Sequence, residues 1–278
     1  MCFLGHPNYS GLKVLRNMNE VDKLSKKAFF RSYMALEVKY KFSSDVKYPC
    51  IPENIDDSTT VYASSGKSVI NGLEYFLAKV LGCEFDSVIG VMIPYKTEVV
   101  DSAGDDDDYL KTIEDLNSIN DYKKSAPFLY IQKQIQAERR KYPSKSFENL
   151  SYKDRGNAGY GLTSKGLGGK RKFDIKTGGT VEMTGGVFSS PLICSSITAL
   201  VRCVIGECLN NVNLLGGRVL SVTTDGFLTD VKDLEEELLK LPEERVTFLK
   251  SFRLLRKYLS GDPKALEIKH EENGGILS

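Results

Sequence analysis

The chain has 278 residues, of which 41% are hydrophobic and 27% charged, an ordinary globular composition with room for one large domain or two smaller ones. Its formal net charge of +1 says little about a polyanionic partner, because acidic and basic residues are segregated along the chain. Acids are concentrated at 101–108 and 235–244, and bases at 123–145 and 165–176. Local basic stretches are therefore the candidate surfaces for a polyanion.

The cysteines and histidines exclude a zinc knuckle, because the six cysteines form no Cys-x-x-Cys pair and only two histidines are present. Cys203 and Cys208 lie in an apolar run of helical character, where small buried thiols are expected. The first residues form too short an apolar run for a signal peptide, and no stretch reaches the roughly 18 apolar residues of a membrane span. We expect a soluble intracellular protein with reduced thiols and no membrane partner.

The first third of the chain predicts a small layer of mixed α and β structure. Alternating side chains at 33–42 predict a strand, and apolar residues at helical spacing predict a helix from Ser68 to Leu81. Asp86 to Pro94 is rich in β-branched residues and stops at a proline, which predicts a second strand. The acidic stretch 101–120, with four adjacent aspartates at 105–108, is most simply a solvated loop rather than a metal site.

The middle of the chain predicts two helices followed by a basic, glycine-rich loop. The first helix spans Tyr122 to Tyr142 and ends at a proline, and the second spans about Ser146 to Gly161. Two helices joined by a short turn form a helical hairpin. Residues 165–186 then favour a β-hairpin, with strands at 172–175 and 180–183.

The last third begins with Ser189 to Asn211, the most strongly apolar helix in the chain. Its only charged residues are Arg202 and Glu207, so we expect it to be buried on most faces. The pair Asp225-Gly226 between two β-prone runs predicts a tight hairpin. Two helices at 231–240 and 243–258 and a short strand at 265–270 complete the prediction.

One group of candidate functional residues lies on the second predicted helix. Lys153, Asn157 and Tyr160 fall at positions i, i+4 and i+7, so they share one helical face. Lysine can neutralise a triphosphate, and tyrosine can stack beside a sugar or a base. The alternative is that this face is simply the solvated side of an amphipathic helix.

The second candidate is Asp225 at the tip of the predicted hairpin. Magnesium prefers hard oxygen ligands and commonly takes one or two carboxylates together with substrate phosphates. A carboxylate at a hairpin tip is well placed for that task. The alternative is that Asp225 only serves the turn.

Both motifs, in this order, resemble those of family B DNA polymerases. Residues 153–161 resemble the Lys-x-x-x-Asn-Ser-x-Tyr-Gly motif of the fingers, with Ala158 in place of serine. Residues 221–226 resemble the Tyr-x-Asp-Thr-Asp-Ser hairpin of the palm, in which Asp225 would be the second aspartate. Residues 190–210 resemble the long palm helix, and residues 47–52 and 72–82 resemble the palm segment that follows the first metal motif. Residues 265–270 resemble the stretch that opens toward the thumb.

This resemblance implies an α+β fold, a polymerase palm of antiparallel sheet backed by helices, with an inserted helical hairpin as fingers. The expected divisions are the N-terminal part of the palm at 1–100, the fingers and acidic loop at 101–165, the palm at 166–258 and the start of the thumb at 259–278. The implied reaction is template-dependent nucleotidyl transfer by a DNA-directed DNA polymerase of phage, plasmid or virus type. Two Mg²⁺ ions would serve the intact enzyme, with primer-template DNA and a dNTP as partners.

The resemblance also implies a role for each candidate residue. The catalytic residue would be Asp225, which would bind metal together with Thr224. The nucleotide would be bound by Lys153, Asn157, Tyr160, Gly161, Arg139 and Arg140, although plain surface solvation is the alternative for either arginine. DNA would be bound by Lys165, Lys170, Arg171, Lys172 and Lys269, because basic side chains neutralise backbone phosphates.

Three departures from the family pattern limit what we expect of this chain alone. The first metal motif, ending in Tyr-Pro-Thr-x-Met, has no complete copy, and Ser221 and Thr223 replace the tyrosine and first aspartate of the palm hairpin. The exonuclease domain and most of the thumb are also expected to be missing. We therefore expect negligible polymerisation by this chain alone.

Three functional hypotheses remain open on the sequence. The chain could be one piece of a split polymerase, with a separately encoded N-terminal piece or a terminal protein as partner. It could be a non-catalytic, nucleic-acid-binding remnant. It could also be an unrelated α/β protein whose Asp-Gly turn is accidental.

Overall fold

The computed structural model describes most of the chain, which forms two compact units. The described residues are 4–56, 59–96, 127–167, 169, 171–223, 226–260, 264 and 266. The first unit comprises residues 1–203 and the second residues 204–278. Their boundary lies inside helix α8 (Pro191–Leu214). The four subdomain ranges given above remain a prediction.

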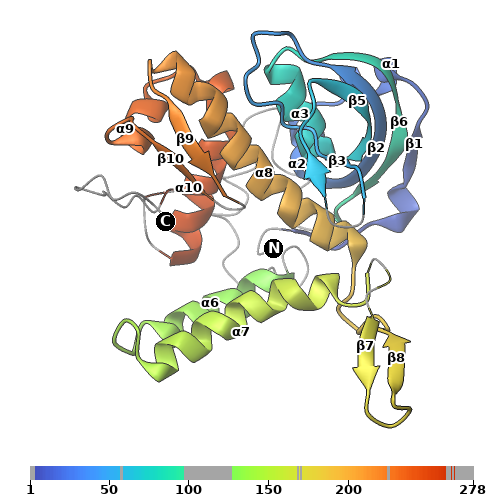
Figure 1. Ribbon diagram of the computed structural model, residues 1–278, viewed down its shortest axis with the longest axis vertical. Helices are drawn as coiled ribbons and strands as arrows, with labels where there is room; N and C mark the ends of the chain where they lie inside the picture. The colour runs from blue at the N-terminus through green and yellow to red at the C-terminus, as the bar shows by residue number, and fades with distance from the viewer. Residues whose placement is uncertain are drawn as a thin grey trace. The chain divides into compact units, whose positions relative to one another are not determined.

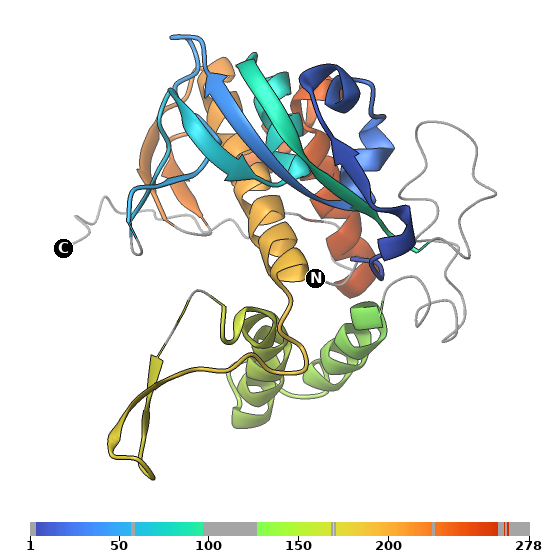
Figure 2. The same cartoon turned by 90° about the vertical axis from the view of Figure 1, so that its right-hand side faces the viewer.

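The first unit is built on a four-stranded antiparallel sheet of order β1-β6-β2-β5 (Figures 1 and 2). The strands are β1 (Lys13–Leu15), β2 (Ser32–Lys41), β5 (Ser65–Ile70) and β6 (Glu84–Pro94). The predicted strands at 33–42 and 86–94 are confirmed as β2 and β6. In β2, Leu36, Val38 and Tyr40 are buried, while Lys39 and Lys41 are exposed. Alternate side chains of this part of the strand therefore face the core.

Helix α3 (Gly72–Val80) follows β5, which corrects the predicted helix from Ser68 to Leu81. The helix begins only at Gly72, because Asn71 and Glu74 form a capping box at that point. The Asn71 side chain accepts a hydrogen bond from the Leu73 amide at 3.0 Å, and Glu74 Oε2 accepts one from the Asn71 amide at 2.8 Å. Residues 65–70 instead extend along β2 as an edge strand.

The rest of this layer consists of short elements. They are η1 (Tyr9–Gly11), α1 (Met18–Asp22), α2 (Lys26–Phe30), β3 (Glu53–Asn54) and β4 (Thr60–Val61). Tyr75 of α3 lies with its ring centroid 4.5 Å from that of Phe85 on β6, and both are buried. The core of the first unit therefore lies between α3 and the sheet.

The predicted helical hairpin is confirmed as α6 (Pro127–Arg139) and α7 (Phe147–Ser164), which lie side by side in Figures 1 and 2. Buried Asn149 joins the two helices, because its Nδ2 donates to the Arg139 carbonyl at 3.1 Å. Gln132 Nε2 also donates to the Gly156 carbonyl at 3.2 Å. The acidic stretch 101–120 and the start of the first helix lie outside the described residues.

The basic loop carries the predicted β-hairpin, with strands β7 (Arg171–Asp174) and β8 (Gly179–Glu182). Its two ends meet at a narrow neck, where Ser189 Oγ donates to the Lys165 carbonyl at 2.5 Å. Gly166 has a φ of +72°, and a Cβ there would lie 2.5 Å from the Gly185 amide nitrogen. Both the backbone conformation and the close approach require glycine at this neck.

Helix α8 is the apolar helix predicted at 189–211, and its N-terminal half belongs to the first unit. Leu192 and Ile193 pack against Tyr33 and Tyr95 at one end of the sheet. By length and composition α8 could cross a membrane, so the prediction that no stretch reaches span length is wrong. A single such helix is weak evidence of a span, and buried polar side chains with partners, such as Ser196, are typical of a helix in a protein core.

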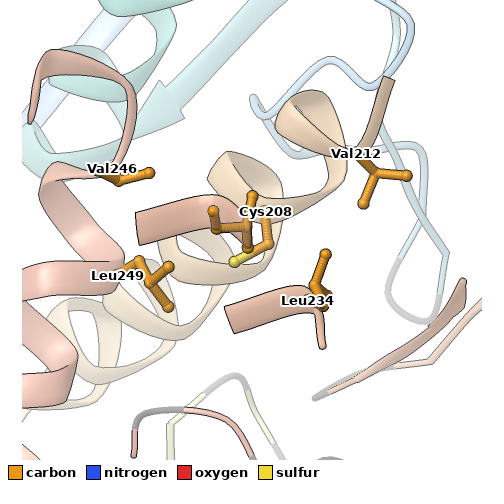
Figure 3. Packing of buried hydrophobic residues seen from close by; sticks show 6 residues of the cluster. Cys208, Val212, Leu234, Val246 and Leu249 are labelled. Carbon is orange, nitrogen blue, oxygen red and sulfur yellow. The ribbon is translucent and has the colours of Figure 1, made fainter. Parts of the chain in front are cut away.

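The second unit packs the C-terminal half of α8 against small elements. These are β9 (Val219–Val222), β10 (Phe227–Thr229), α9 (Leu234–Leu239), η2 (Glu243–Arg245) and α10 (Thr247–Ser260). Its buried apolar cluster consists of Cys208, Val212, Leu234, Leu238, Val246 and Leu249 (Figure 3). The predicted strand at 265–270 lies outside the described residues except for Leu266.

Glu207 fixes the start of α10 within this unit. Its carboxylate accepts hydrogen bonds from the backbone amides of Phe248 and Leu249 at 3.0 and 2.8 Å. These amides belong to the first turn of the helix, where no carbonyl of the helix itself is available to them. None of the five described cysteines forms a disulfide, and four of them are buried.

Candidate functional site

The face predicted to bind a nucleotide is an exposed surface of α7. Lys153, Asn157, Tyr160 and Gly161 are all exposed. The opposite face of the helix points inward, because Asn149 and Thr163 are buried and Gly156 lies against α6. The structure therefore brings these four residues together on one helical face, as their spacing predicts.

Tyr160 connects this face to helix α8. Its side chain lies beside Cys194 and near Arg202, both on α8. Partial burial raises the pKa of the Tyr160 hydroxyl, the Cys194 side chain raises it further, and Arg202 opposes the shift. Tyr160 therefore stays a neutral phenol at physiological pH while 38% of it remains exposed.

Arg202 is in turn held by a buried carboxylate. Its Nε lies 2.7 Å from Glu74 Oε1, and the Glu74 side chain is only 2% exposed. The other oxygen of Glu74 accepts the Asn71 amide, and Asn71 Nδ2 donates to Ser196 Oγ on α8 at 3.1 Å. Glu74 thus has partners at both oxygens, which a buried carboxylate requires.

We call Asn71, Glu74, Arg202 and Tyr160 the polar bridge, because they join α3, α8 and α7 within the first unit. Tyr62 lies at the edge of this bridge. Burial raises the pKa of the Tyr62 hydroxyl, and the nearby Arg202 only partly opposes this rise. Sequence reasoning missed the bridge apart from Tyr160. Two signals were present, a capping-box pattern at 71–74 and a lone arginine in an otherwise apolar helix.

The two arginines predicted to meet phosphate have different surroundings at the end of α6. Arg139 is partly buried, and its Nε donates to Asn149 Oδ1 at 3.3 Å, so it also holds the helical hairpin together. Arg140 is exposed. Their role in nucleotide binding remains a prediction.

The predicted DNA-binding residues lie on the β7–β8 hairpin and its neck. Lys165 and Lys172 are exposed, at the neck and on β7 respectively. Arg171 is also exposed, but its Nη2 donates to the Thr180 carbonyl on β8 at 2.9 Å. Lys170 and Lys269 lie outside the described residues.

The predicted metal ligands Thr224 and Asp225 also lie outside the described residues, but the hairpin around them is described. The amide and the hydroxyl of Thr223 both donate to the Gly226 carbonyl, at 2.8 and 3.0 Å. At the hairpin base, Asp230 Oδ1 accepts the Arg218 amide at 2.6 Å and Oδ2 accepts Arg218 Nε at 3.0 Å.

These contacts limit what the hairpin could offer a magnesium ion. Asp230 is held by Arg218, and the hydrogen bond from the Arg218 amide lowers the pKa of its carboxyl. No group of three or more metal-binding side chains occurs among the described residues. Asp230 is the only carboxylate among the described residues of this hairpin, 218–223 and 226–230, and both of its oxygens accept hydrogen bonds from Arg218.

Comparisons with known proteins bear on this arrangement. No protein-family model matches the chain. The chain is 28% identical over 193 residues to the primer-independent DNA polymerase PolB of Escherichia coli, covering 69% of this chain and 20% of that protein. Its fold matches phi29 DNA polymerase complexed with primer-template DNA and incoming nucleotide substrates, with a TM-score of 0.51 and 12% identity. That match covers 85% of this chain and 38% of the phi29 chain.

The chain resembles a phage-type family B DNA polymerase. Its mixed helical and antiparallel-sheet structure has that polymerase fold, so the α+β palm prediction is confirmed. The hypothesis of an unrelated α/β protein is wrong. Because the chain spans only a fifth of the length of the Escherichia coli relative, the activity of a whole polymerase is a matter of proposal.

Proposed function

We propose that this chain forms the palm and fingers of a DNA-directed DNA polymerase that transfers nucleotides to a primer under the direction of a template. The observation that carries the proposal is the exposed face of α7. It presents a cation, an amide, an aromatic ring and a glycine in the order of the fingers motif. The similarity to a DNA polymerase over 193 residues supports the same function.

In this proposal the α7 face binds the incoming dNTP. Lys153 meets the triphosphate as a flexible positive charge, with Arg139 and Arg140 as further phosphate ligands. Asn157, Tyr160 and Gly161 border the nucleotide and the new base pair, where a tyrosine ring can stack and a glycine permits close approach. The polar bridge supports this role, because it gives Tyr160 fixed neighbours on α8.

Asp225, with Thr224, would hold magnesium at the palm hairpin, and the intact enzyme would use two Mg²⁺ ions. Such ions lower the pKa of an attacking hydroxyl and stabilise a leaving pyrophosphate. The two ions need a second carboxylate, and the family's first metal motif has no complete copy in the 278 residues. We infer that this chain alone supports negligible extension.

Primer-template DNA would lie along the basic β7–β8 hairpin, contacted by Lys165, Lys170, Arg171 and Lys172, with Lys269 near primer phosphates. Such contacts release counterions and make binding weaken as salt increases. A separately encoded N-terminal polymerase piece is one candidate partner, and a terminal protein is the other.

Replacing Lys153 with alanine tests the proposed dNTP site. The affinity for a fluorescent dATP analogue, measured with Mg²⁺ and primer-template, should fall about 10- to 100-fold, because a charge-assisted hydrogen bond contributes about 1.5–3 kcal/mol. The matched control is Lys13→Ala, which removes an exposed lysine from β1, outside the proposed binding surfaces. Unchanged affinity in K153A, or an equal loss in both variants, would contradict the assignment.

A second candidate function is favoured by Ser221 and Thr223, which stand where the family's palm hairpin has its tyrosine and first aspartate. A non-catalytic nucleic-acid-binding protein would need neither. It would bind primer-template in a salt-dependent manner and show no extension even when the first metal motif is supplied by another polypeptide.

A further inference from the structure

The closed end of the α6–α7 hairpin exposes apolar side chains. Phe147, the first residue of α7, is 82% exposed, and Leu150 beside it is also exposed. Figure 1 shows that the turn joining the two helices lies at this end of the hairpin. Covering an exposed phenylalanine ring is favourable by roughly 1.5–3 kcal/mol relative to leaving it in water, so a flat apolar ligand gains by stacking on it.

Two tyrosines and an arginine form an ordered stack at the same end. The rings of Tyr142 and Tyr152 are 5.9 Å apart and nearly parallel, with an interplanar angle of 16°. The guanidinium carbon of Arg155 lies 5.0 Å from the centre of the Tyr152 ring. Flat aromatic faces flanked by a stacked arginine are the features that proteins use to bind unpaired bases.

The charge of this end suits a polyanion. Between Glu138 and Arg155 the chain has six basic and three acidic residues. One acid is already paired, because Lys141 Nζ lies 2.6 Å from Glu138 Oε1. Arg140, Lys145 and Arg155 are exposed, and Arg140 and Lys145 lie in the turn segment that joins α6 to α7. The remaining acids, Glu148 and Asp154, leave a surplus of positive charge for phosphate groups.

We propose that this aromatic tip, formed by Tyr142, Phe147, Tyr152 and Arg155, binds unpaired nucleotides of a single nucleic-acid strand. A base stacks on the Phe147 ring, and exposed cations such as Arg140 and Lys145 lie along the sugar-phosphate backbone. A double helix does not suit the tip, because its bases are already stacked on one another. The tip goes beyond the proposed polymerase function, since this binding requires neither a metal ion nor nucleotidyl transfer.

The test compares two probes on the purified 278-residue chain and its Phe147→Ala variant. The probes are a fluorescein-labelled oligothymidylate and an abasic oligomer of equal length, which keeps the phosphates but lacks the bases. Loss of one base stack should weaken binding of the oligothymidylate about 5- to 100-fold, as measured by fluorescence anisotropy without metal or dNTP. Affinity for the abasic oligomer should be the same for both proteins.

The matched control is Tyr9→Ala, which removes an exposed aromatic ring from η1, outside the hairpin, and should leave both affinities unchanged. Phe147 is mostly solvated, so its loss removes no core packing, and circular dichroism can verify the fold. The proposal is overturned if the chain does not bind the oligothymidylate, if F147A binds it as tightly as the unaltered chain, or if both probes lose affinity equally. Since no dNTP is present, failure of the Lys153 prediction leaves this result unaffected.

Discussion

Replacing Asp225 with asparagine is expected to reduce primer extension by about 10²- to 10³-fold in a mixture of this chain with a polypeptide that carries the first metal motif. In our proposal Asp225 is the one carboxylate of the palm hairpin that is available to a metal ion. Asparagine keeps the size of the side chain and suits a turn, but its amide is a much weaker ligand for magnesium than a carboxylate. The rate of radiolabelled dNTP incorporation measures the effect.

The matched control for this experiment is Asp233→Asn in the same unit. Asp233 has a φ of 50° and makes no side-chain capping hydrogen bond at the start of α9. Asparagine tolerates this left-handed backbone well, so the control removes one negative charge with little effect on folding. Extension that persists in D225N, or that is lost equally in D233N, would show that Asp225 is not a metal ligand.

The second large effect concerns stability, because Glu74→Ala is expected to destabilise the first unit by about 3–5 kcal/mol. The substitution removes the partner of Arg202 and leaves the Asn71 amide without its acceptor. It also removes the capping box that starts α3. Urea unfolding followed by circular dichroism measures the loss. If the dependence of the unfolding free energy on urea concentration is the same in both proteins, the shift of the midpoint gives the loss in unfolding free energy.

Glu37→Ala provides a control of the same chemical type. Glu37 forms an ion pair with Lys67 at 2.7 Å, but its side chain is 43% exposed, so water screens the interaction. Its loss should change the unfolding free energy by no more than about 1 kcal/mol. A cost for E74A as small as that of E37A would mean that the polar bridge contributes nothing to stability.

The sequence allowed the antiparallel strands, the helical hairpin and the α7 face to be predicted, because each depends on local patterns. Alternation gives the buried face of β2, Asp-Gly marks the β9–β10 turn, and spacing places Lys153, Asn157 and Tyr160 on one side of a helix. Apolar spacing alone places the start of α3 too early, because the capping box at Asn71 sets where the helix begins.

The polar bridge could not be predicted in this way, because it depends on contacts between distant residues. Glu74 and Arg202 are 128 residues apart, and nothing local indicates that they form an ion pair. What the sequence does show is that a lone charge in an apolar helix needs a partner. Both charged residues of α8 follow that rule, since Arg202 pairs with Glu74 and Glu207 binds the first amides of α10.

Crosslinking of an incoming nucleotide tests most directly whether α7 forms the dNTP site. The chain is irradiated with 4-thiothymidine triphosphate, Mg²⁺ and primer-template, and the labelled tryptic peptide is identified by mass spectrometry. Our proposal predicts that the label concentrates in residues 156–165, the peptide that contains Asn157 and Tyr160, and that it does so only when the template base is adenine. Label absent from this peptide, or spread over many peptides regardless of the template, would contradict it.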